Sequence, residues 1–473
     1  MDLDVLTGVL RVVFFTFIVI SAFLLVGAFL RARFQLFQRL FLPASVIGGF
    51  IGLILGPIVL KDYAVLPFPE DWITIASLLP GLLIVPVVAS VPLGMRFGSR
   101  KKTGRKKSSG TRNVFIMFFV LGSVLAAQNF YGVFVAGTFK SFFNFDEIYA
   151  TFGTELAAGF AGGHGTAGVV GNLLQSMGQP FWNTAQGVTT TTATVGIVSG
   201  ILIGIVFINI AARKGLTSFI KSGTSIPEDV RTGIQRDVSK QKAIGKETTN
   251  AASIDSLGFH LALILVVSGL AFVATYFFEK YDILILNLIP EWAYAIVFMY
   301  GVWALMIKFD LAWIVDVETK TKVASSLTEF AIVAAIISLP LQAVFTLILP
   351  IVVMVTGGLI ITFGLAYYLS KKFFTDYWVE RSVTVLGTNT GVFLTGLLLL
   401  TMVDPDMKSP VLRDYSFSYS INSIISFVLF PLSFGVLINY GFLSGLALYA
   451  FVFIIFISLL LIMRRKNKQE GIV

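Results

Sequence analysis

Long apolar runs alternate with short polar segments along almost the whole chain. Each run is about 20 residues long, which is the length that an α-helix needs to cross a bilayer. The first half predicts spans at residues 12–30, 41–60, 72–95, 113–138 and 185–210. The second half predicts spans at residues 257–278, 292–308, 323–340, 343–370, 418–438 and 442–463. The pattern therefore predicts an all-α integral membrane protein with about 11 transmembrane helices.

Glycine interrupts two further segments, which lie at comparable places in the two halves. Residues 162–168 read Gly-Gly-His-Gly-Thr-Ala-Gly, and residues 387–391 read Gly-Thr-Asn-Thr-Gly. Hydrocarbon cannot solvate a free backbone, so such breaks are tolerated at membrane depth only where protein or a water-filled cavity surrounds them. We predict re-entrant hairpins at 150–182 and 379–403, which is typical of an inverted-repeat transporter fold.

A hydrophilic stretch at residues 211–256 divides the chain. It predicts a cytoplasmic linker between an N-terminal membrane repeat (1–210) and a C-terminal membrane repeat (257–463), with a tail at 464–473. The first hairpin is expected to enter from outside and the second from inside, as two halves of inverted topology require.

Lysine and arginine predict the orientation. The loop at 96–112 and the linker at 211–256 hold eight basic residues each, whereas the alternate loops hold only Lys61, Lys140 and Lys280. Basic residues favour the cytoplasmic side, so the N-terminus is expected outside and the C-terminus inside the cytoplasmic membrane. Because the positive charge lies in loops between spans, the net charge of +9 does not indicate nucleic-acid binding. Acidic residues near the N-terminus argue against a cleavable signal.

Composition narrows the chemistry. The chain is 56% hydrophobic and 13% charged, and it has no cysteine, which excludes disulfides and thiol catalysis. Its two histidines are too few for a histidine-based metal site, and no paired catalytic groups are evident within the spans. We therefore expect no enzyme activity, no resident metal and no cofactor.

The first hairpin carries the most informative polar residues. Glu155 is a candidate ion ligand or lysine partner because a carboxylate at membrane depth is costly, and the alternative is a solvated position at the mouth. His164 is expected to hold the loop by a hydrogen bond, with direct substrate contact as the alternative. Thr166 and the backbone at Gly163 and Gly165 would face the site if a helix begins there, because helix N-termini attract carboxylates.

Other polar residues lie within apolar runs. Gln128 and Asn129 are expected to face protein or cavity, because a lipid-facing amide is unfavourable. Thr388, Asn389 and Thr390 give the second hairpin similar groups, although threonines often bond to their own helix. All of these are candidate substrate ligands. The hydroxyl groups of Thr390 and of the threonine at 166 are also candidate oxygen ligands for a cation.

Three stretches resemble one known family. Residues 42–49 (Leu-Pro-Ala-Ser-Val-Ile-Gly-Gly), 127–129 (Ala-Gln-Asn) and 162–166 (Gly-Gly-His-Gly-Thr) resemble patterns of the sodium/glutamate symporter family. The resemblance implies sodium as coupling ion, glutamate as substrate, a homodimer, and a core domain that carries both hairpins and slides against a scaffold. The second hairpin departs from the family, since Thr-Gly-Leu-Leu at 395–398 replaces a Thr-Pro-Thr-Ala-like run. The last span is additional to a five-plus-five plan.

These patterns together predict a secondary active transporter in the lipid bilayer. It would carry glutamate or a related small amino or organic acid, anionic or zwitterionic, with sodium. Arg381 and Arg413 are the nearest cations in sequence that could bind a second carboxylate, although both also fit the positive-inside pattern. The alternatives are a non-coupled channel and a diverged binding or receptor protein of the same fold.

Overall fold

The computed structural model describes residues 3–40, 42–65, 72–95, 108–219, 228, 232–241, 243–281, 291–405 and 408–469. Within these ranges the regular structure is helical and contains no strand. Eight of the described helices are long and apolar enough to cross a membrane. Most of the basic loop predicted at 96–112 lies outside the described residues.

The helices follow the apolar runs closely. The first half contains α1 (Leu3–Arg33), α2 (Gln35–Arg39), α3 (Ala44–Leu55), α4 (Pro57–Leu60), α5 (Trp72–Ala89), α6 (Ser108–Phe142), α7 (Thr154–Ser176) and α8 (Trp182–Arg213). The second half contains α10 (Ser256–Lys280), α11 (Glu291–Lys308), α12 (Val317–Ile337), α13 (Leu341–Thr346), α14 (Ile348–Phe373), α15 (Trp378–Val403) and α16 (Val411–Gln469). Between the end of α8 and the start of α10, the described part of the predicted linker includes a short 3-10 helix, Val238–Lys240.

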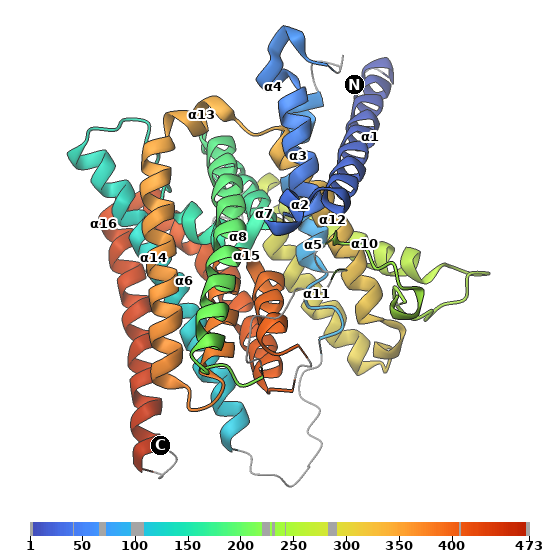
Figure 1. Cartoon of the computed structure of the whole chain (residues 1–473). Coiled ribbons are helices and arrows are strands. Elements are labelled where there is room, and N and C mark those ends of the chain that lie inside the picture. The colour runs from blue at the N-terminus through green and yellow to red at the C-terminus, as the bar shows by residue number, and fades with distance from the viewer. Residues whose placement is uncertain are drawn as a thin grey trace.

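The helices form two groups that lie side by side (Figure 1). One group, which we call the α5 group, consists of α1, α3, α5, α10, α11 and α12, and it packs around Trp72, Trp292 and Ala334. The other, the α6 group, consists of α6, α7, α8, α14, α15 and α16. The two groups meet mainly where α5 and α12 contact α7.

The helix α7 folds back on itself at Gly163, whose φ of 66° and ψ of −164° are not helical. The ring of Tyr149, which precedes α7, stacks on the ring of Phe181, which follows it, with the centroids 4.8 Å apart. A straight helix of this length would separate its ends by about 33 Å. The segment therefore consists of two arms whose outer ends lie together.

The helix α15 reverses in the same way at Gly391 and Val392, where the backbone is again non-helical. A Cβ atom on Gly387 would lie 2.9 Å from the Cα atom of Gly396, although nine helical residues span about 13 Å. Only residues without a side chain allow the two arms to approach this closely.

The helix α16 is also two helices, which are joined at Gly441 (φ 76°). Leu437 on the first arm and Tyr449 on the second both pack against Val133 of α6. The two arms of α16 are therefore antiparallel. The sequence predicts this division, because it has separate apolar runs at 418–438 and 442–463.

Candidate functional site

The breaks in α7 and α15 contact each other. A Cβ atom on Gly163 would lie only 2.6 Å from the Cγ1 atom of Val392. Val392 has a φ of 64°, which is unusual for a β-branched residue, so the second tip keeps a strained backbone. Two segments from opposite halves of the chain thus bring their non-helical backbone to one place.

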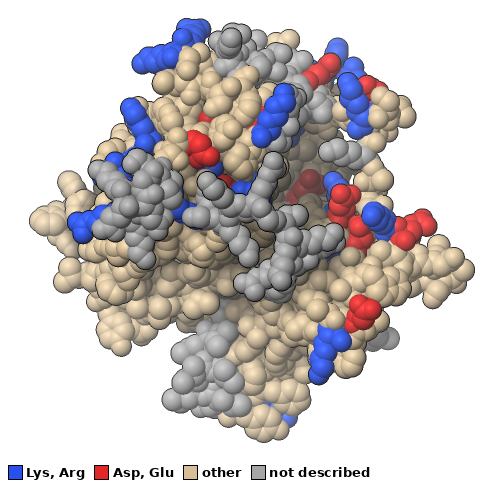
Figure 2. All heavy atoms as spheres, turned by 90° about the horizontal axis from the view of Figure 1, so that it is seen from below, with Lys and Arg blue, Asp and Glu red and all other residues tan. Residues whose placement is uncertain are grey.

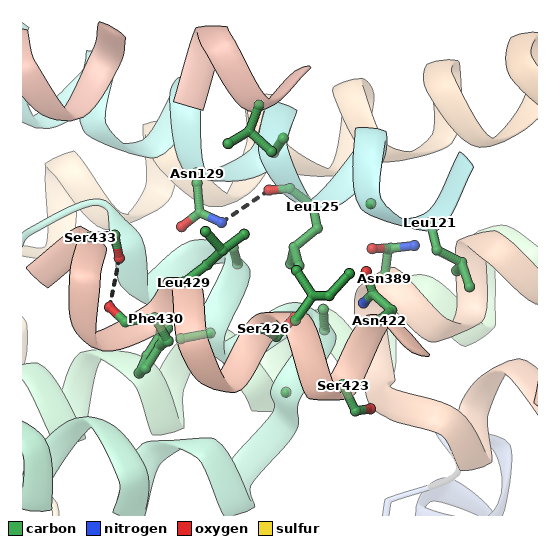
Figure 3. A pocket seen from close by; sticks show the side chains of 18 of the residues that line it. Leu121, Leu125, Asn129, Asn389, Asn422, Ser423, Ser426, Leu429, Phe430 and Ser433 are labelled. Carbon is green, nitrogen blue, oxygen red and sulfur yellow. Dashed lines mark hydrogen bonds between the residues drawn. The ribbon is translucent and has the colours of Figure 1, made fainter. Parts of the chain in front are cut away.

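A cavity of about 220 Å³ lies beside these tips. Figure 3 shows it between α6, with Asn129 and Leu125, the first arm of α16, with Asn422, and the tip region of α15, with Asn389. The first arm of α7 contributes small residues, among them Ala158 and Gly162. The cavity therefore opens against both broken helices.

Four of the predicted site residues line the cavity: Asn129, Thr166, Thr388 and Asn389. The Nδ2 atom of Asn129 donates to the carbonyl of Leu125 at 3.0 Å, and that of Asn389 donates to the carbonyl of Val385 at 3.1 Å. The hydroxyl of Thr388 donates to the carbonyl of Thr384 at 2.7 Å. These bonds to the preceding turn fix the orientation of the polar groups along their helices.

Other predicted site residues hold the hairpin tips instead of lining the cavity. His164 Nε2 lies 2.9 Å from the hydroxyl oxygen of Thr194, so a hydrogen bond joins α7 to α8 at this point. Gln128 Nε2 donates to the hydroxyl of Thr362 and to the carbonyl of Asn389, each at 2.7 Å. The buried Oε1 atom of Gln128 has no hydrogen-bond partner among the residues that the structure describes.

The tip of α15 is anchored tightly to α8. The hydroxyl of Thr390 donates to the carbonyl of Leu386 at 2.9 Å, and a Cβ atom on Gly196 would meet the carbonyl oxygen of Thr390 at 2.6 Å. Gly200 contacts the Thr390 side chain. Thr390 is therefore enclosed by its neighbours.

Gly165 faces the α5 group. A Cβ atom there would lie 3.8 Å from Ile84 and 3.9 Å from Thr328. Three residues later, a Cβ atom on Gly168 would lie 2.6 Å from the carbonyl oxygen of Pro80. The second arm of α7 thus forms the boundary between the two helix groups.

Glu155 is fully buried near the start of α7. Its carboxylate accepts a hydrogen bond from the Tyr149 hydroxyl at 3.0 Å and another from the Gly153 amide at 2.8 Å. No ion pair to Glu155 occurs within the described ranges, and the residue does not lie at an exposed mouth. Its partners are a phenol and a backbone amide, not the predicted lysine.

The two candidate arginines do not line the cavity. Arg381 is fully buried and pairs with Asp414 at 3.0 Å and with Asp376 at 3.5 Å. Its guanidinium also lies 4.5 Å from the ring centroid of Phe374. Arg413 pairs with Asp414 at 2.8 Å. Arg381 therefore connects the start of α15 to the start of α16, whereas Arg413 pairs with its neighbour within α16.

The first arm of α16 supplies polar groups that were not among the substrate and ion ligands predicted from the sequence. Asn422, Ser426 and Ser433 line the cavity together with Leu429 and Phe430. Residues 422, 426, 429, 430 and 433 are separated by four, three, one and three positions, which places all five on one face of a helix. This spacing could have identified the residues from the sequence, because polar residues on one face of an apolar span indicate that the face packs against protein and not lipid.

The comparison with protein families matches most of the chain to one family. A family model described as sodium/glutamate symporter matches residues 11–377. The match begins within α1, continues through α14 with the break at Gly163, and ends one residue before α15 begins at Trp378. No curated protein matches the chain.

Proposed function

The chain belongs to the sodium/glutamate symporter family, and we propose that it is a secondary active transporter that couples sodium to the movement of a small amino or organic acid. Family membership together with the apolar helices makes it a multi-pass membrane transport protein. The contact between the breaks at Gly163 and Val392, beside a cavity, is the observation that carries the proposal. Broken helices expose the backbone groups that transporters use for ions and substrates.

In the bilayer, α7 and α15 would be re-entrant hairpins within two inverted repeats. The order α1, α3, α5, α6, α7, α8 has a counterpart in α10, α11, α12, α14, α15 and the first arm of α16. The linker at 211–256 joins the two sets, and the second arm of α16 is additional. This arrangement gives eleven spans and two hairpins.

Transport would proceed by an elevator-type movement of the α6 group against the α5 group. Glycines at 165 and 168 allow α7 to lie close to α5, and small residues at such a boundary favour sliding. A bond from Gln186 Nε2 to the carbonyl of Ser77, 3.2 Å long, crosses the boundary and would have to break. The α5 group would then remain fixed, and the family resemblance implies that it forms the homodimer.

Orientation can be tested with single cysteines, because the chain has none of its own. Figure 2 shows Lys and Arg side chains on the lower face, where α16 ends, and basic residues also occupy the last turns of α8 and α14. In intact cells, a membrane-impermeant reagent is expected to label Asp146→Cys and to leave Ser108→Cys unlabelled until the cells are opened. Labelling of Ser108→Cys from outside would reverse the proposed topology.

Sodium dependence is the central functional prediction. Replacing sodium by choline at constant pH is expected to abolish concentrative uptake in proteoliposomes. Carbonyl groups at the broken helices, with hydroxyls such as those of Thr166 and Thr390, would supply oxygen ligands for the ion. Downhill flux that persists without sodium would indicate a channel, and binding without flux would indicate a receptor. Uptake that follows the proton gradient would make Glu155 the first candidate proton carrier.

A further inference from the structure

One face of α12 is polar and exposed in the first half of the helix. It carries six polar residues: Thr321, Lys322, Ser325, Ser326, Thr328 and Glu329. Successive residues of an α-helix turn by about 100°, so these six lie within a sector of about 160°. Five of the six are exposed, whereas every residue from 333 to 337 is buried. We call these six residues the polar face of α12.

The polar face extends to membrane depth. Glu329 lies within the apolar run at 323–340 that the sequence predicts as a span. It is about 9 Å along the helix axis from residue 323. No ion pair to Glu329 occurs among the residues that the structure describes. A charged side chain at this depth faces water or protein and not lipid, because hydrocarbon does not solvate it.

The polar face borders the boundary between the α5 group and the α6 group. A Cβ atom on Gly165, beside the break in α7, would lie 3.9 Å from the Cγ2 atom of Thr328. The next residue of α7, Thr166, lines the cavity. The tip of the first hairpin therefore lies between the cavity and the polar face, and an ion that leaves the tip on this side meets α12.

In the proposed orientation the polar face runs from the hairpin tip to the cytoplasm. Two spans, α10 and α11, separate the cytoplasmic linker from α12, so α12 starts on the cytoplasmic side. Lys322 precedes Glu329 by seven residues and therefore lies about 10 Å nearer the cytoplasm on the same face. The face thus presents an anionic group near the tip and a cationic group near its cytoplasmic end.

We propose that the polar face of α12 lines a water-filled route from the hairpin tips to the cytoplasm, and that Glu329 attracts the coupling cation along this route. The inference rests on the proposed function and adds the residue that the ion passes on the cytoplasmic side. A carboxylate beside a narrow aqueous path raises the local concentration of cations, because low-dielectric walls focus its field. Glu329 acts on the approach of the ion and is not a ligand at the tips.

Single cysteines test whether the polar face is in contact with water, and the result does not depend on transport. In inside-out vesicles, a membrane-impermeant thiol reagent is expected to label Ser325→Cys and Ser326→Cys, because a hydrated thiol ionises and reacts. Val297→Cys on α11 is the control: Val297 is 63% exposed but lies on an apolar helix, where lipid would cover it. It should remain unlabelled.

Two labelling results would overturn the proposal. Absence of label at both serine positions in inside-out vesicles would show that lipid or another subunit covers the polar face. Label at these positions from outside in intact cells would show that the route does not lead to the cytoplasm.

Neutralising Glu329 tests its effect on the ion. Sodium-driven glutamate transport would be measured in inside-out and right-side-out vesicles, with choline keeping the ionic strength constant. We expect Glu329→Gln to raise the half-maximal sodium concentration at least about threefold on the cytoplasmic face and to leave the outer face unchanged. Glu318→Gln removes an exposed carboxylate about 16 Å nearer the cytoplasm, where salt screens it, and should change neither value.

The sign of the shift separates an electrostatic role from a structural one. Lys322→Gln removes a positive charge from the same route and should lower the half-maximal sodium concentration on the cytoplasmic face. Shifts of the same sign in both charge variants, equal shifts at the two faces of the membrane, or no shift in Glu329→Gln would overturn the role of Glu329. Labelled serine positions in a protein without sodium-dependent glutamate transport would instead overturn the proposed function and leave the water-filled route intact.

Discussion

Replacing Gly163 by valine is expected to abolish substrate uptake while the protein still accumulates in the membrane. The residue has a φ of 66°, which disfavours any side chain, and a Cβ atom would lie 2.6 Å from Cγ1 of Val392. The two hairpin tips would have to separate, and displacement of binding groups by about 1 Å commonly costs about a hundredfold in rate. Uptake into proteoliposomes, normalised to the amount of inserted protein, measures the effect.

Gly178 provides a control, because it also has a positive φ but does not contact the other hairpin tip. Gly178 has a φ of 65°, and a Cβ atom on it would have no neighbour within 4 Å. Gly178→Ala therefore adds a side chain at a positive φ without a new contact, whereas Gly163→Ala also meets Val392. We expect Gly178→Ala to transport normally and Gly163→Ala to transport poorly. Adding Val392→Gly to Gly163→Ala should restore part of the uptake. Wild-type uptake by Gly163→Val would show that the break in α7 is not part of the binding site.

The long apolar helices and the two breaks were predictable because each depends on local composition. Hydrocarbon selects apolar runs of sufficient length, and glycine marks the places where a helix cannot continue. The turn between α12 and α13 was likewise indicated by Pro340, since α12 ends at Ile337 and Pro340 precedes α13.

The assignment of residues to the cavity was less predictable, because it depends on which way each side chain faces after packing. Gln128 and Asn129 are adjacent in sequence, yet Gln128 ties α6 to α14 while Asn129 faces the cavity. Thr388 and Thr390 differ in the same way: Thr388 lines the cavity, and Thr390 is enclosed by the glycines of α8. Neighbours on a helix point about 100° apart, so a polar cluster in sequence does not define a face.

The ion pair of Arg381 is a long-range contact that could not be predicted from the sequence. Arg381 and Asp414 are 33 residues apart, and only the folding of α15 brings the start of this helix to the start of α16. From the sequence alone, Arg381 and Arg413 could equally be cytoplasmic residues that follow the positive-inside rule or ligands for a substrate carboxylate. Burial of Arg381 beside Asp414 and Phe374 instead indicates a structural role.

Removal of Arg381 is expected to destabilise the protein strongly. Asp414 is fully buried, and among the described residues Arg381→Ala would leave its carboxylate with Arg413, whose side chain is 58% exposed. Breaking a buried pair by removing one partner costs about 3–5 kcal/mol, whereas an exposed arginine contributes about 0–1 kcal/mol. The thermal unfolding temperature of Arg381→Ala should therefore fall far more than that of Arg413→Ala.

A charge-free double variant tests whether the loss comes from the unpaired carboxylate. Arg381→Met with Asp414→Leu removes both charges and keeps apolar volume, so we expect it to recover most of the stability lost in Arg381→Ala. Arg413→Ala should leave the ratio of dicarboxylate to monocarboxylate affinity unchanged, because Arg413 does not line the cavity. Equal destabilisation by the two alanine variants would contradict the structural role of Arg381. A change in that affinity ratio in Arg413→Ala would instead place the arginine in the binding site, because the exposed end of its side chain would then reach the substrate.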